Sequence, residues 1–113
     1  MKIIESAQKA LRDEIEGLSL LKEFFNSDFE KAVDAIFNSK GKVVVTGVGK
    51  SGHIGRKISA TLSSTGTPSY FIHPTEASHG DMGMIEEKDI ILAISWSGET
   101  TELGNIVKYA LEN

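Results

Sequence analysis

The chain is built around residues 43–55, which read Val43-Val44-Val45-Thr46-Gly47-Val48-Gly49-Lys50-Ser51-Gly52-His53-Ile54-Gly55. The opening β-branched run is typical of a strand buried on both faces, as in a parallel sheet covered by helices. Gly47, Gly49 and Gly52 remove side chains where the backbone turns sharply or approaches a ligand closely. Backbone N–H groups at the start of the following helix point toward an anion. These residues therefore predict a strand, a phosphate-binding turn and a helix.

Two more pairs of strand and helix follow this first one. The strands are expected at residues 42–46, 69–72 and 90–94, and the helices carry the apolar sets Ile54, Ile58, Leu62 and Leu103, Ile106, Val107, Ala110, Leu111. Three alternations of strand and helix predict an α/β fold with a parallel sheet and right-handed crossovers. The expected architecture is a three-layer, flavodoxin- or Rossmann-like domain with three βα units. Because three strands make a small sheet, we expect residues 39–113 to be the first half of a larger domain.

Two helices are expected before the first strand, in residues 1–38. Apolar residues at three- and four-residue spacings predict an amphipathic helix to about Phe25: Ile4, Ala7, Leu11, Ile15, Leu18 and Leu21. Ser27 and Glu30 fit a capping box that opens a second helix. Both helices are assigned to the same domain as the strands. The first one fits core packing or a dimer-forming arm equally well, since three βα units offer it little to cover.

Composition excludes several classes of protein. With 113 residues, 40% apolar and 25% charged, the chain fits one ordinary soluble domain. It has no cysteine, which excludes disulfides and thiolate metal sites. A net charge of −4 argues against nucleic acid as a partner. No apolar run reaches the roughly 18 residues of a membrane span, and the N-terminus lacks a signal-peptide core. Together these features favour the cytoplasm.

The glycine turn admits two nucleotide-binding interpretations. Gly47-x-Gly49-x-x-Gly52 after a strand matches the dinucleotide fingerprint, but the acidic residue expected at the end of the second strand is replaced by His73. Gly49-Lys50-Ser51 also resembles the end of a P-loop, whose first glycine would fall at Val44, inside the strand. NAD therefore remains an alternative ligand, and ATP binding by this route is disfavoured.

A second turn rich in hydroxyl groups follows the third strand. Ser95, Ser97 and Thr100 surround Gly98 at the start of a helix, which suits a phosphate group. Plain helix capping by Ser97 explains the same residues without a ligand. Two such turns at the carboxyl ends of two parallel strands favour the ligand, because open α/β sheets bind ligands at that edge.

These residues resemble a known family, the sugar isomerase (SIS) domain, and within it the arabinose-5-phosphate isomerases. The motifs that carry the resemblance are Gly47-Val48-Gly49-Lys50-Ser51-Gly52-His53-Ile54-Gly55, Ser64-Thr65-Gly66-Thr67-Pro68, His73-Pro74-x-Glu76-Ala77-x-His79-Gly80-Asp81 and Ser95-x-Ser97-Gly98-Glu99. The resemblance implies interconversion of D-arabinose 5-phosphate and D-ribulose 5-phosphate through an enediolate, in supply of Kdo for lipopolysaccharide or capsule. An alternative of a different class is a non-catalytic SIS module that senses a phosphosugar.

The resemblance also implies roles for individual residues. Lys50 matches the family's catalytic lysine, Glu102 its catalytic glutamate and His79 a substrate-contacting histidine. The substrate and phosphate positions it implies are Ser51, Gly66, Thr67, Ser95, Ser97 and Thr100. No redox cofactor is expected, and His73 matches a position linked to a divalent metal, zinc. The expected partners are a phosphosugar and further copies of the chain, as a dimer or tetramer, with neither nucleic acid nor membrane.

Two departures from the family bear on activity. Trp96 stands where a smaller or polar residue is expected. The family also places a further glutamate and a histidine of the active site beyond the equivalent of Asn113, along with the rest of the SIS domain and usually a pair of CBS domains. The 113 residues alone are therefore predicted to bind phosphate weakly and to turn over little or nothing.

Overall fold

The computed structural model describes residues 2–78, 80–96 and 101–113, without the side chains of Ser78, Asp81, Thr101 and Glu102. The chain divides into two compact units, residues 1–37 and 38–113. The second unit holds the sheet and its helices: β1 (Val43–Gly47), α3 (Lys50–Ser64), β2 (Ser69–Phe71), α4 (Pro74–Ser78), the 3₁₀ helix η2 (Asp81–Met84), β3 (Ile90–Ile94) and α5 (Thr101–Glu112). The predicted alternation of strands and helices is confirmed.

The three strands form a parallel sheet in the order β2-β1-β3. In the central strand, Val44 pairs with Tyr70 of β2 on one side and with Ile91 of β3 on the other. The valines of β1 are at most 1% exposed, which is why this segment reads as a continuous β-branched run. Strand β3 has the bounds predicted for it, β1 begins and ends one residue later than predicted, and β2 ends one residue earlier.

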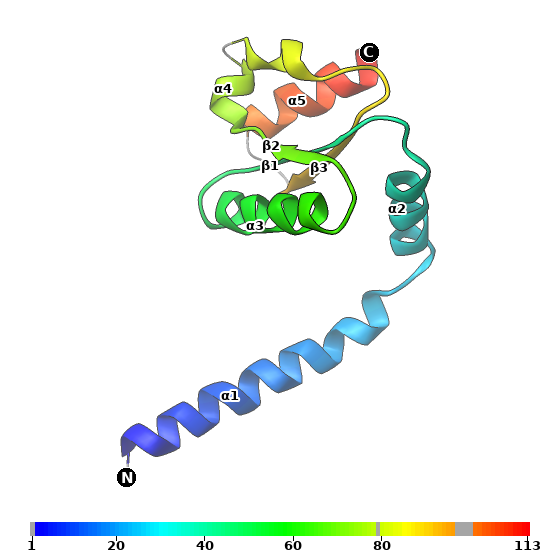
Figure 1. The fold of residues 1–113 in the computed structure, drawn as a ribbon. Coiled ribbons are helices and arrows are strands. Elements are labelled where there is room, and N and C mark those ends of the chain that lie inside the picture. The colour runs from blue at the N-terminus through cyan, green and yellow to red at the C-terminus, as the bar shows by residue number, and fades with distance from the viewer. Residues whose placement is uncertain (1, 79, 97–100) are drawn as a thin grey trace. The chain divides into compact units, whose positions relative to one another are not determined.

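Helices cover both faces of the sheet, as the three-layer prediction requires. Figure 1 shows α3 on one side of the strands and α4 and α5 together on the other. On the side of α4 and α5, Val44 packs with Ile72, Ala77 and Ile106 in a buried apolar cluster. The short helices α4 and η2 lie in a glycine- and histidine-bearing segment to which the sequence assigns no helix.

Helix α3 packs on the sheet through small residues. Its buried positions are Gly52, Gly55 and Ser59, and a Cβ on Gly55 would lie 3.1 Å from Cγ1 of Val45. The apolar residues that mark this helix in the sequence lie elsewhere, and Ile54 is 55% exposed. The helix can therefore approach the strands more closely than its apolar residues would allow.

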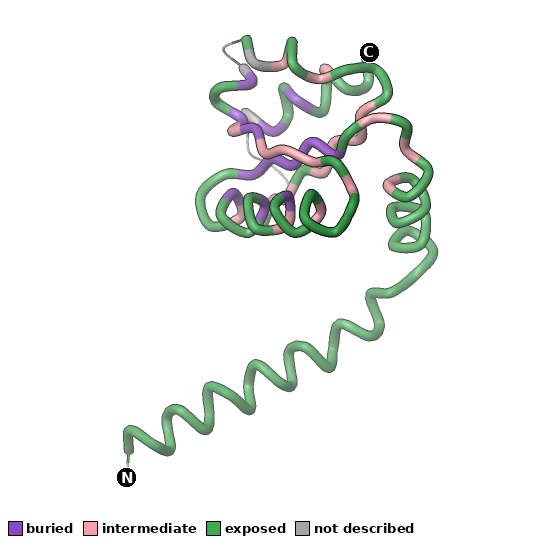
Figure 2. Tube along the Cα trace, viewed as in Figure 1, coloured by how far each residue is buried: buried purple, intermediate pink, exposed green. Residues whose placement is uncertain are grey.

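The first unit is helical, with α1 (Lys2–Leu20), the 3₁₀ helix η1 (Leu21–Phe24) and α2 (Ser27–Asn38). The α-helical part of the first helix thus ends before the predicted Phe25. The capping box at Ser27 is wrong in detail, because the side-chain oxygen of Asn26 accepts the N–H groups of Asp28 and Phe29. None of the described residues of this unit is buried (Figure 2).

No helix among the described residues is both long and apolar enough to cross a bilayer.

In the variant Tyr70→Phe, the free energy of unfolding should fall less between pH 9 and pH 11 than in the wild type. Burial and then the nearby carboxylates of Asp89 and Glu86 raise the pKa of Tyr70, whose hydroxyl donates to the carbonyl oxygen of Met84 at 3.0 Å. The unfolded state therefore loses this proton first, and the free energy of unfolding falls above about pH 10. Urea unfolding at pH 9 and 11 measures the effect; an unchanged pH dependence in Tyr70→Phe would contradict it.

Candidate functional site

The turn after β1 lies at the carboxyl edge of the sheet and leads directly into α3. Gly49, with φ 61° and ψ −129°, precedes the first residue of α3 and offers no side-chain cap. Such a positive φ favours glycine over residues that carry a Cβ. The first N–H groups of a helix lack partners within the helix. The turn therefore presents backbone donors at the edge where α/β sheets bind ligands.

Gly47 and Gly52 have a different role in this turn. A Cβ on Gly52 would lie 2.7 Å from the carbonyl oxygen of Gly47, and one on Gly47 would lie 3.0 Å from the carbonyl oxygens of Ile94 and Ser51. These two glycines let backbone segments of the protein approach one another, whereas the sequence also allowed close approach to a ligand. Lys50, the first residue of α3, lies between these two closely packed glycines, which hold its backbone in place.

The ends of β1 and β3, where the two turns begin, lie next to each other. The last residues of the two strands, Gly47 and Ile94, are paired across the sheet. Lys50 is exposed at the start of α3, while Ser51 and Ser95 are half-buried. The structure thus brings Lys50 and Ser51 to the same edge as Ser95.

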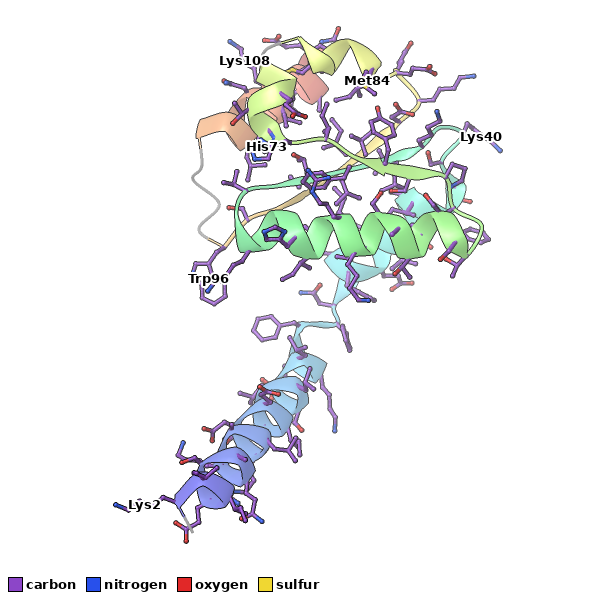
Figure 3. The ribbon with its side chains drawn as sticks, turned by 60° about the vertical axis from the view of Figure 1, so that its left-hand side comes forward. Lys2, Lys40, His73, Met84, Trp96 and Lys108 are labelled. Atoms are coloured by element: carbon purple, nitrogen blue, oxygen red, sulfur yellow. The ribbon has the colours of Figure 1, made fainter. Side chains whose placement is uncertain are left out.

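Several predicted site residues cannot be compared with the structure. His79, Ser97 and Thr100 lie outside the described residues. Glu102 lies in the first turn of α5, and its side chain is not described. Trp96, next to Ser95, is fully exposed. Figure 3 shows Trp96 and His73 at one edge of the sheet and Lys40 at the opposite edge.

His73 follows β2 at the same edge as Lys50. Its Nδ1 accepts the backbone N–H of Thr75 at 3.1 Å, so a neutral ring carries its proton on Nε2. Zinc ligation through Nε2 would require this proton to move to Nδ1 and the hydrogen bond from Thr75 to break. The described residues contain no group of three His, Asp or Glu side chains that could hold a metal ion. Zinc at His73 stays an untested prediction, and no chemical step is assigned to it.

Gly66 and Thr67 lie at the far end of α3 from Lys50. The helix has 15 residues, which corresponds to a length of about 22 Å at a rise of 1.5 Å per residue. Because α3 begins at the carboxyl edge and leads back to the start of β2, the Gly66–Thr67 turn lies at the amino edge. One copy of the chain therefore does not bring these two residues and Lys50 to the same substrate.

A cavity of about 210 Å³ opens beside the turn after β1. It is lined by Gly47, Gly49, Gly52, His53, Arg56, Phe71 and His73. The guanidinium carbon of Arg56 lies 4.2 Å from the centroid of the Phe71 ring. Neither Arg56 nor Phe71 is predicted as a site residue from the sequence. The spacing of the small residues of α3 indicates the face of the helix nearest the strands, but it does not indicate the contact between Arg56 and Phe71.

The sequence of the chain is similar to those of known proteins. A family model described as the SIS domain matches residues 35–113. Arabinose 5-phosphate isomerase KdsD of Yersinia pestis is 55% identical over 103 residues, which cover 91% of this chain and 31% of that protein. Arabinose 5-phosphate isomerase GutQ of Escherichia coli K12 is 50% identical over 105 residues, which cover 93% and 33%. The chain thus spans about a third of the length of these relatives.

Two solved structures share the fold. The protein c3406 of E. coli CFT073, in complex with arabinose 5-phosphate, has a TM-score of 0.90 and 39% identity, with 98% of this chain and 59% of that chain covered. A putative phosphosugar isomerase involved in capsule formation, from Bacteroides fragilis, has a TM-score of 0.86 and 39% identity, with 97% and 58% covered. The backbone that carries the two turns is therefore shared with proteins described as acting on, or bound to, phosphosugars.

Proposed function

The chain belongs to the SIS domain family, and on this basis we propose that it is part of an enzyme that interconverts D-arabinose 5-phosphate and D-ribulose 5-phosphate. The observation that carries the proposal is the pairing of Gly47 with Ile94. It places the turn that bears Lys50 beside the turn that bears Ser95. Relatives named for this reaction, about half identical over the same segment, support the choice of substrate.

The reaction needs a base, a group that stabilises an oxyanion and a group that opens the cyclic sugar. We assign the base to Glu102, which removes the proton from C2 of the aldose and returns it to C1, while the hydroxyl proton on O2 is transferred to O1. The ammonium group of Lys50 stabilises the enediolate oxygen, and His79 assists ring opening. In this isomerisation C1 is reduced while C2 of the same molecule is oxidised, so the reaction requires no redox cofactor.

The phosphoryl group of the substrate is assigned to the two neighbouring turns. Ser51 from the first turn, together with Ser95, Ser97 and Thr100 from the second, supplies hydroxyl donors. Backbone N–H groups at the helix starts add donors of fixed direction, and the helix dipoles favour a negative charge there. Trp96 follows Ser95 directly in the chain, and its indole can pack on the sugar or on a neighbouring subunit.

We further propose that the active enzyme is a homo-oligomer, a dimer or tetramer. Gly66 and Thr67, if they contact substrate, contact it in the site of another copy, because α3 separates them from Lys50. The exposed apolar residues of the first helix, such as Leu11 and Leu18 at 59% and 67% exposure, supply a face for such an assembly. The pathway we propose is cytoplasmic supply of Kdo for lipopolysaccharide or capsule.

A hybrid protein tests the proposed reaction. Residues 1–113 replace the matching segment of the Yersinia pestis relative, whose remaining two thirds supply the rest of the enzyme. We expect the hybrid to convert arabinose 5-phosphate to ribulose 5-phosphate at a rate within about tenfold of the relative's, as measured by the ketose formed, whereas residues 1–113 alone give little or no turnover. A folded hybrid, judged by circular dichroism, that lacks turnover would remove the proposal.

A further inference from the structure

The cavity beside the turn after β1 contains a positive charge with no described counter-charge. The described residues that line it include Arg56 and two histidines but no carboxylate. Among the described residues, no carboxylate forms an ion pair with Arg56, whose recorded contact is with the ring of Phe71. No carboxylate of the described residues therefore engages the N–H donors of Arg56, which can bind a ligand in the cavity.

Phe71 holds the guanidinium at the wall of this cavity. The ring of Phe71 packs against α3 where the helix has no side chains: a Cβ on Gly55 would lie 3.2 Å from Cε2 of the ring. With this backbone against it, the ring has little freedom to move. Arg56 lies 4.2 Å from its centroid, a distance at which stacking and the cation–π attraction act together. The planar group is thus oriented before any ligand arrives.

The other polar side chains of the cavity are also potential donors. Nδ1 of His73 accepts the N–H of Thr75, so the neutral ring presents an N–H at Nε2. His53 adds a second imidazole to the lining. A set of N–H donors around a small space matches an oxyanion, and charged donors form the stronger hydrogen bonds to one. The volume of about 210 Å³ suits one small group rather than a large ligand.

We propose that this cavity is an oxyanion subsite and that Arg56 is its principal ligand for a phosphate or carboxylate group. The subsite is lined by the turn after β1 and by residues in and after β2, whereas the donors assigned to the phosphoryl group of the proposed substrate come from the turns after β1 and β3. The two positions share the turn after β1 and differ in the neighbouring strand that completes them. The subsite accepts an acidic group whether it is free in solution or belongs to a larger sugar derivative, and it does not depend on isomerase chemistry.

Titration of the 113-residue chain, followed by the ¹H and ¹⁵N amide signals of the cavity glycines, tests the proposal. The probes are inorganic phosphate and acetate, added at constant ionic strength. We expect the signals of Gly49 and Gly52 to shift and saturate. Arg56→Gln should weaken binding about tenfold or more, because a hydrogen-bonded charge is lost. Lys57→Gln, which removes the same charge from the next residue of α3, should change affinity less than twofold.

A third variant separates the charge of Arg56 from the shape of its guanidinium. Arg56→Lys keeps the charge but loses the planar fork, so its affinity should lie between those of the wild type and Arg56→Gln. Equal binding by Arg56→Gln and wild type, or an equal loss in Lys57→Gln, would overturn the proposal. So would phosphate-induced shifts confined to Ser95 and Trp96. Saturation by phosphate but not acetate assigns a phosphate ligand, and the reverse a carboxylate, whether or not the hybrid isomerase is active.

Discussion

Lys50→Met in the hybrid isomerase should lower kcat by about 10³-fold, with a change in KM for arabinose 5-phosphate of less than tenfold. Methionine nearly keeps the length of the side chain and removes its charge. If the ammonium stabilises the enediolate oxygen, its contribution is larger in the transition state than in the bound substrate. Loss of one such donor costs about 10²–10³ in rate, and a full charge lies at the upper end of this range. Initial rates over a range of substrate concentrations separate kcat from KM.

Lys57→Met is the matched control for Lys50→Met. It removes a lysine from the same helix at a position outside the residues assigned to the site, and we expect rates within twofold of the hybrid. The comparison also separates an enzyme from a phosphosugar sensor. In a sensor, Lys50→Met reduces ligand affinity and there is no turnover to lose, whereas an enzyme loses rate far more than affinity. A rate unchanged by Lys50→Met would exclude the assigned role.

The strands could be predicted because their residues are nearly uniform in chemistry. Three valines in a row leave little choice for a segment that ends in glycine, and this run is the buried central strand. Residues 90–94 are as uniformly apolar and form β3 with the predicted bounds, although this strand is less buried than β1. The order of the strands brings their carboxyl ends together, and with them Lys50, Ser51 and Ser95. This part of the site follows from the pattern of strands and helices alone.

The remaining parts depend on contacts between residues distant in the sequence. In α3 the apolar spacing predicts the helix correctly, yet the face toward the sheet is the one with Gly52, Gly55 and Ser59. Arg56 and Phe71 are 15 residues apart and belong to different elements, so their stacking has no signature in either segment. Gly66 and Thr67 match family positions, but only the direction of α3 shows that they leave the site of their own chain. Family likeness thus identifies candidate residues without showing that one chain brings them to the same site as Lys50.

Gly52→Ala should lower the free energy of unfolding by about 2 kcal/mol or more, although alanine is the better helix former. In an open helical position the exchange stabilises by about 1 kcal/mol. At Gly52 the new Cβ would lie 2.7 Å from the carbonyl oxygen of Gly47, a backbone atom at the end of a buried strand that has little room to move. The backbone of the turn must then shift, at a cost of about 3 kcal/mol. Urea unfolding of the 113-residue chain measures the net change.

Gly104→Ala supplies the control for this prediction, because it makes the same exchange inside a helix. Apart from the adjacent residues and the nearby backbone of α5, no atom of the described residues lies within 4 Å of a Cβ placed on Gly104, so this variant should gain the roughly 1 kcal/mol of helix propensity. Opposite signs at the two positions attribute the loss in Gly52→Ala to the contact with Gly47 and not to the substitution itself. Because the same shift displaces the turn that carries Lys50, Gly52→Ala should also reduce the rate of the hybrid isomerase. A Gly52→Ala protein at least as stable as wild type would mean that the strand end and the helix do not approach as closely as described.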